Sequence, residues 1–120
     1  MIINDLERED TLNSLEVIGL IEELESLGSA RTVNEEMELQ ELRAFAAEAE
    51  TINSDWTDGT VLINDRHFED YIREQVEEVY SEINFDSFPF GYIDWTYVAE
   101  EAMSDYDEIE LGASTFWIAS

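Results

Sequence analysis

Apolar residues recur at steps of three and four over residues 66–83, and this pattern predicts one amphipathic helix. Its apolar face consists of Phe68, Ile72, Val76, Val79 and Ile83. Its acidic face consists of Asp70, Glu74, Glu77, Glu78 and Glu82. Carboxylates one turn apart lie roughly 5–6 Å apart along a helix axis. Phosphates along one strand of a DNA duplex repeat on about the same scale, since the duplex carries about one charge for every 1.7 Å of axis when both strands are counted.

The N-terminal half predicts two more amphipathic helices. Leucines and isoleucines form an apolar stripe over residues 10–27, with Asp10 or Thr11 as the cap and Gly28 at the stop. Thr32 and Glu35 fit a capping box that begins a helix reaching about residue 50. The short turn between them predicts an antiparallel helical hairpin. Its candidate contact residues, all predicted to face solvent, are Glu22, Glu23, Glu25, Glu35, Glu36, Glu38 and Glu41.

The C-terminal half alternates β-rich and helical stretches. Residues 60–63 predict a strand, Asp94 predicts the cap of a short helix, and residues 106–118 predict a β-hairpin. The element order predicts an α+β fold: a helical hairpin, then a small, mostly antiparallel three-stranded sheet packed with two helices over one face. All 120 residues are expected to form one acidic domain, with residues 10–50 as a separable helical subdomain and residues 60–118 as its α+β core.

The charge of the chain is its most unusual property. It contains 31 Asp and Glu against 5 arginines and no lysine, which gives a formal net charge of −26. Residues 1–60 contain 16 acids and 3 arginines, and residues 61–120 contain 15 acids and 2 arginines, so each half carries −13. This even distribution, together with 12% aromatic residues, excludes a disordered acidic tail. The expected partners are basic protein surfaces, and neither nucleic acid nor a membrane is expected to bind.

The sequence lacks the residues that several kinds of functional site require. The chain has no cysteine, and His67 is its only histidine, which leaves no zinc site of the usual composition. The segment around Asp55, Asp58 and Gly59 fails the EF-hand pattern. No phosphate-binding glycine loop or nucleophile motif is present. We therefore expect no catalytic residue, no metal, no cofactor and no enzymatic activity. Without a long apolar run or a basic signal-peptide region, a cytoplasmic location is expected.

Aromatic residues are concentrated in the C-terminal third, mainly around the loop at residues 84–92. Core and loop packing is the favoured interpretation of this concentration. The alternative is a homodimer patch, because exposed aromatic residues are frequent anchors of interfaces. The candidate patch residues are Phe88, Phe90, Tyr92 and Trp117.

Two hypotheses explain a foldable domain with this charge. In the first, the chain is a DNA mimic whose carboxylates occupy phosphate-like positions in the basic cleft of a DNA-binding protein. In the second, it is a structural or interaction domain adapted to high salt, where screening removes the self-repulsion. Glutamate outnumbers aspartate 21 to 10, which argues mildly against salt adaptation.

Four segments carry a resemblance to a known family: LINDRHFEDY at residues 62–71, IDW at 93–95, DY at 105–106 and TFW at 115–117. They resemble phage- and plasmid-encoded antirestriction proteins, and distantly the C-terminal part of the ArdA type, over about residues 60–118. The resemblance implies an inhibitor made by a mobile element. Such a protein acts in the host cytoplasm and occupies the DNA-binding site of a restriction–modification enzyme. A CRISPR effector is the second expected class of target, because the same occupation of a basic DNA-binding site by carboxylates would inhibit it.

Overall fold

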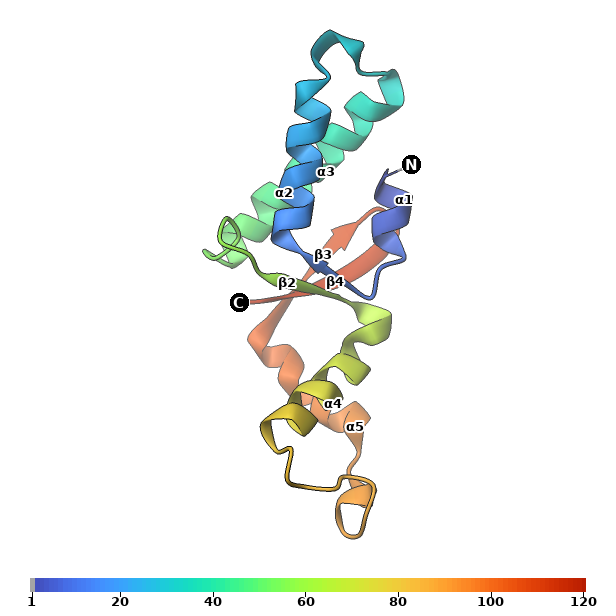
Figure 1. Cartoon of the computed structure of the whole chain (residues 1–120), viewed down its shortest axis with the longest axis vertical. Coiled ribbons are helices and arrows are strands. Elements are labelled where there is room, and N and C mark those ends of the chain that lie inside the picture. Colours follow the sequence, from blue (N-terminus) through green and yellow to red (C-terminus); the bar gives the residue numbers. More distant parts are fainter. Residues whose placement is uncertain (1) are drawn as a thin grey trace.

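The computed structural model describes residues 2–120, which form an elongated α+β structure of 62 × 26 × 21 Å. A four-stranded sheet crosses the middle of the long axis (Figure 1). The α-helices and strands of this part of the chain are α1 (Ile2–Glu7), β1 (Thr11–Asn13), α2 (Ser14–Ser26), α3 (Val33–Ile52), β2 (Val61–Asn64), α4 (Phe68–Val79), α5 (Trp95–Ala102), β3 (Tyr106–Leu111) and β4 (Ser114–Ala119). The predicted fold class and the predicted helical hairpin, α2–α3, are confirmed.

The sheet has the strand order β1-β2-β4-β3, and every neighbouring pair is antiparallel. Leu62 in β2 pairs with Leu12 on one side and with Ile118 on the other. The next residue, Ile63, pairs with Trp117. Since successive side chains of a strand point to opposite faces, Leu62 and Ile63 make both faces of the sheet apolar.

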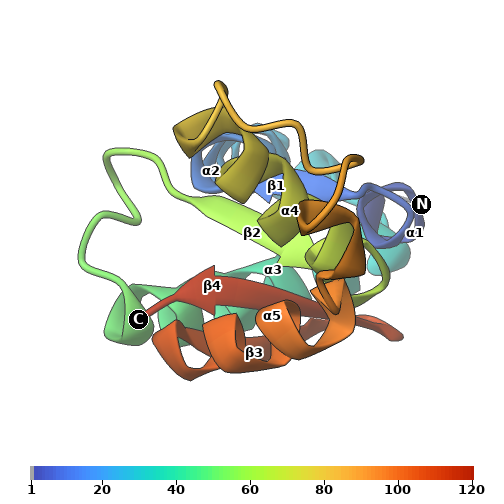
Figure 2. The same ribbon diagram turned by 90° about the horizontal axis from the view of Figure 1, so that it is seen from below.

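Each face of the sheet is covered by its own helices. The larger core joins the face of Leu62 to the α2–α3 hairpin, and Phe45 and Trp56 pack there. The smaller core joins Ile63 to Phe68 of α4 and Ala99 of α5. Figure 2, viewed from below, shows α4 and α5 on the near side of the sheet. The expectation that the helices cover one face was therefore wrong, because both faces of β2 are buried.

The prediction missed two elements near the N-terminus. Residues 11–13 form strand β1, so the sheet has four strands and not three. Helix α2 begins only at Ser14, and Asn13 caps it by accepting a hydrogen bond from the Leu15 N–H at 2.9 Å. Helix α1 precedes the strand and buries Ile3 and Leu6 in the larger core. A three-residue strand has too few positions to show a period of two.

The chain after α1 is fixed by side chains from distant strands. Asn64, which is buried, donates its amide N–H groups to the carbonyls of Glu7 and Glu9 at 3.0 and 3.1 Å. The Ser114 hydroxyl also donates to the Glu7 carbonyl, at 3.1 Å. These contacts join α1 to β2 and β4, and thus to the body of the sheet.

The central helix is shorter than predicted. Helix α4 covers Phe68–Val79, a 3₁₀ turn precedes it, and residues 80–83 leave the helix. Val79 belongs to the predicted apolar face, yet it is 71% exposed. Tyr80, which follows it, is also exposed. A last helical turn without a surface to pack against gains little from burial, and this explains the early end.

Candidate protein-interaction surface

The shape and the charge together give the molecule a high linear charge density. A net charge of −26 over 62 Å corresponds to one net negative charge for each ~2.4 Å of the long axis. A DNA duplex carries one for about 1.7 Å, counting both strands. Averaged over its long axis, the chain therefore approaches the charge density of a duplex.

Few of these carboxylates are neutralised within the molecule. Among residues 2–120, ion pairs shorter than 4 Å involve five carboxylates, those of Asp10, Glu25, Glu36, Glu77 and Asp86. Each pairs with an arginine at the surface, where such pairs contribute little to stability. Most of the acidic side chains are consequently available to a partner.

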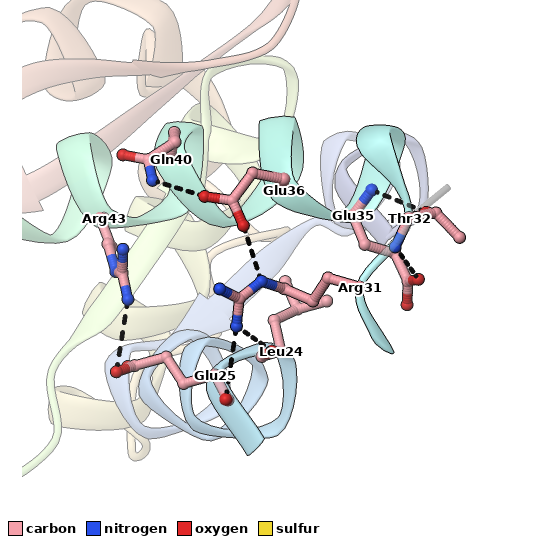
Figure 3. Close-up of polar contacts among 8 residues, drawn as sticks. All are labelled: Leu24, Glu25, Arg31, Thr32, Glu35, Glu36, Gln40 and Arg43. Atoms are coloured by element: carbon pink, nitrogen blue, oxygen red, sulfur yellow. Dashed lines mark hydrogen bonds and ion pairs between the residues drawn. The ribbon is translucent and has the colours of Figure 1, made fainter. Parts of the chain in front are cut away.

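The turn of the α2–α3 hairpin is held by two arginines, as Figure 3 shows. Arg31 donates through one nitrogen to the carbonyls of Leu24 and Glu25 at the end of α2, at 3.0 and 3.3 Å. Its Nε donates to Glu36 at 2.7 Å. Arg43 reaches the Glu25 carboxylate at 3.4 Å. A cation at the C-terminus of α2 also interacts favourably with the helix dipole.

The Glu36 carboxylate has the best-defined electrostatic environment of this turn. Gln40 donates to its Oε1 at 3.0 Å, and Arg31 binds its Oε2. These hydrogen bonds, Gln40 first and Arg31 second, lower the pKa of Glu36 below its ordinary value of 4.5. Glu36 is therefore part of the local structure of the hairpin as well as an acidic group on its surface.

Six of the twelve predicted contact carboxylates have structural partners or are buried. Glu25, Glu36 and Glu77 pair with arginines. Glu35 accepts from the Thr32 N–H at 3.0 Å in the predicted capping box, and Glu41 accepts from the Gly112 N–H at 3.0 Å. Glu38 is only 4% exposed, so the expectation that it faces solvent was wrong. It lies in the same stripe of α3 as the buried Leu42 and Phe45.

The other six are exposed and make no side-chain hydrogen bond or ion pair within residues 2–120. Asp70, Glu74 and Glu78 stand at intervals of four on α4, which places them about 6 Å apart along one side of the helix. Glu22 and Glu23 lie on α2. Glu82 was expected in the α4 row, but it lies beyond the end of the helix.

The sequence reasoning missed a third group of acids in the middle of the molecule. Asp107, Glu108 and Glu110 are exposed on β3, the outer strand beyond β4. Glu100 and Glu101 are exposed on α5. Strand β3 alternates less clearly than a half-buried strand, because acids occupy both of its faces. Acids on both faces of a strand indicate that neither face is fully buried, as at the edge of a sheet. This pattern could have identified these residues as exposed to solvent.

The candidate aromatic patch divides into two groups. Phe88 and Tyr92 are 83% and 81% exposed, and Phe90 is partly exposed beside them. Trp117, by contrast, packs on Phe68 with ring centroids 5.5 Å apart, and its Nε1 donates to Asp65 at 2.8 Å. Trp117 is partly buried against the smaller core and lies on β4, apart from the other three residues, which lie in the loop between α4 and α5.

Comparisons of the chain with protein-family models, with curated proteins and with solved structures found no match. Among residues 2–120, no group of three or more His, Asp or Glu side chains is arranged to hold a metal ion. None of the helices in this part of the chain is both long and apolar enough to cross a bilayer.

Proposed function

We propose that the protein is a non-enzymatic DNA mimic that occupies the basic DNA-binding cleft of a host defence protein. The observation that carries the proposal is the linear charge density, one net negative charge for each ~2.4 Å over a 62 Å axis. Unpaired carboxylates occur on α2, on β3 and on α4, which span the length of the molecule (Figure 1). A basic cleft built for phosphates would meet negative charge all along this length.

Binding would proceed by electrostatic attraction followed by many weak ion pairs. Complementary charge raises association rates and makes them sensitive to salt. The residues proposed to contact the target are the six free carboxylates defined above, together with the acids of β3. The resemblance over residues 60–118 supports a restriction–modification enzyme as the target, with a CRISPR effector as the second class.

A competition experiment tests the proposal. A purified restriction–modification methyltransferase is bound to a fluorescent DNA duplex, and the protein is titrated in at several salt concentrations. We expect it to displace the duplex, with an apparent affinity that falls steeply as salt rises. The triple variant Asp70→Asn, Glu74→Gln, Glu78→Gln should bind more weakly and with a smaller salt dependence.

The matched control removes an ion pair without changing the net charge. The double variant Arg43→Gln, Glu25→Gln should compete like the parent chain, because that carboxylate already has an internal partner. Formation of a complex that saturating DNA leaves intact would refute mimicry. Unfolding of the chain in low salt, with no DNA-competitive binding to restriction or CRISPR proteins, would instead favour the high-salt-adapted domain.

A further inference from the structure

The loop between α4 and α5, residues 80–94, forms one end of the long axis (Figure 1). It presents two aromatic side chains, Phe88 and Tyr92, which are 83% and 81% exposed. Their ring centroids lie 6.0 Å apart with an interplanar angle of 85°, an edge-to-face pair. Both rings are more exposed than Val33 and Val79, the next most exposed of the large hydrophobic side chains described.

The loop is held in shape from beneath. Phe85 is buried and packs edge-on against Phe90 and Trp95, with centroids 5.9 and 5.7 Å apart. The guanidinium of Arg73 lies over the Trp95 ring at 5.2 Å and reaches Asp86 at 3.2 Å. These contacts tie the loop to α4 and α5.

Hydrogen bonds within the loop complete its structure. The Asn84 side chain accepts from the Asp86 N–H at 3.0 Å, and the Ser87 N–H and hydroxyl both donate to the Asn84 carbonyl. The Gly91 N–H donates to the Ser87 carbonyl at 3.0 Å. A loop already ordered in the free protein loses little conformational entropy on binding, so its exposed rings are suited to an interface.

The loop that carries this aromatic pair is acidic. Glu82, Asp86 and Asp94 are exposed in the same loop. At its base lies a cavity of about 280 Å³ lined by Glu77, Ser81, Ile83, Asn84, Phe85 and Asp86. Both carboxylates of this lining, Glu77 and Asp86, already pair with Arg73, so the unpaired charge of the loop comes from Glu82 and from Asp94. A complementary surface must therefore offer an apolar pocket with basic side chains at its edge.

We propose that Phe88 and Tyr92 form an apolar anchor that inserts into such a pocket on the same DNA-binding protein. This inference rests on the proposed function and adds a specific, salt-insensitive contact to it. A second copy of the chain fits the loop poorly, because two chains that each carry a net charge of −26 repel one another, and the exposed Glu82 and Asp94 of the loop add to that repulsion. Two rings also offer far less than the ~800 Å² that each partner buries in a standard interface.

The two parts of the surface would then have separate tasks. Distributed carboxylates govern the association rate and its salt dependence. A buried aromatic anchor mainly slows dissociation, and it distinguishes one basic cleft from another. Charge alone would leave the protein bound to many DNA-binding proteins with similar strength.

Binding kinetics to the methyltransferase of the competition experiment test the anchor. The double variant Phe88→Ala, Tyr92→Ala should dissociate about tenfold faster or more, as is usual for a truncated aromatic hot spot. Its association rate and salt dependence should stay those of the parent. The control variant, Val33→Ala, Met37→Ala, removes two exposed apolar side chains at the opposite end, and its dissociation rate should not change.

Further measurements separate the outcomes. Both variants should unfold in urea at the same midpoint as the parent, which confirms that each is folded, and both should bind poly-arginine like the parent, because neither changes the net charge. Equal dissociation rates for the parent and the Phe88→Ala, Tyr92→Ala variant would overturn the anchor while mimicry stands. A parent that fails to bind the methyltransferase or compete with DNA would remove both proposals. Sedimentation that shows a dimer of the parent, lost in the variant, would assign the rings to self-association and also overturn the anchor.

Discussion

The two helical layers on either side of the sheet differ in what holds them together. The α2–α3 hairpin is specified locally, by the Thr32–Glu35 capping box and by arginines that bridge its turn. It packs on the larger core. The α4–α5 layer rests on a smaller core and ends in exposed apolar residues, Val79 and Phe88 among them. In the hairpin layer most of the predicted contact carboxylates have internal partners or are buried, whereas the other layer leaves more of them exposed and unpaired.

The largest expected effect on stability distinguishes the larger core from the smaller one. Leu42→Ala, at a fully buried position of the hairpin core, should lower the free energy of unfolding by about 2–5 kcal/mol. Ile72→Ala, at the edge of the smaller core, should cost about 2 kcal/mol, the lower end of that range, because water already reaches the site. Urea denaturation at a fixed salt concentration measures both.

Met37→Ala is the control, since its exposed side chain should change the stability by less than about 0.5 kcal/mol. A greater loss for Ile72→Ala than for Leu42→Ala would contradict the ranking of the two cores. It would mean that Ile72 contributes more than Leu42 to the stability of the fold.

A smaller effect on the free energy of unfolding is expected when the helix caps of the two layers are removed. Thr32 and Glu35 bond reciprocally at the start of α3, whereas Asp94 alone accepts from the Tyr97 N–H at 3.2 Å at the start of α5. Thr32→Ala should cost about 1 kcal/mol. Asp94→Ala should cost less, because it also removes one charge from a strongly acidic chain.

The same urea experiment, with Thr57→Ala as an exposed control, measures the difference. An equal or larger cost for Asp94→Ala would mean that the reciprocal bonding adds nothing to the cap of α3. The comparison at neutral pH and again in high salt separates hydrogen bonding from charge, because only the second is screened.

What the sequence predicted correctly is local. The hairpin, its capping box and the stop at Gly28 depend on residues within a few positions of one another, and all three were found. Strand β1 depends on Leu12 pairing with Leu62, fifty residues away, and a periodic pattern does not contain that contact. Val79 fits the apolar face of α4, but the fold provides nothing for it to pack against.

The candidate surface, like the fold, was predictable from the sequence only in its local features. An acidic residue on the polar side of a helix is expected to be exposed, and most of the twelve are. Their partners were not predictable, because Glu25 meets Arg43 across the hairpin and Glu41 meets the β3–β4 turn. Glu38 shows the limit most clearly: it is buried in the same stripe as Leu42, where periodicity alone gives no reason for a carboxylate.

The smallest effect concerns the ionisation of Glu36 in the hairpin turn. Hydrogen bonds from Gln40 and then Arg31 lower its pKa, so Gln40→Ala and Arg31→Gln should each raise that pKa toward 4.5. Carboxyl chemical shifts followed by NMR as a function of pH measure it directly. Because the folded pKa is depressed, the associated stability is present above the unfolded pKa and disappears as pH falls through the folded pKa.

Arg43→Gln provides the control, since Arg43 contributes least among the charges that lower this pKa and the Glu36 titration should barely move. An unchanged Glu36 pKa in both the Gln40→Ala and the Arg31→Gln variants would show that these hydrogen bonds do not control this carboxylate. Glu36 would then belong with the free carboxylates of α2 and α4. The distinction between a self-stabilised hairpin layer and an α4–α5 layer with more unpaired carboxylates would then be weaker.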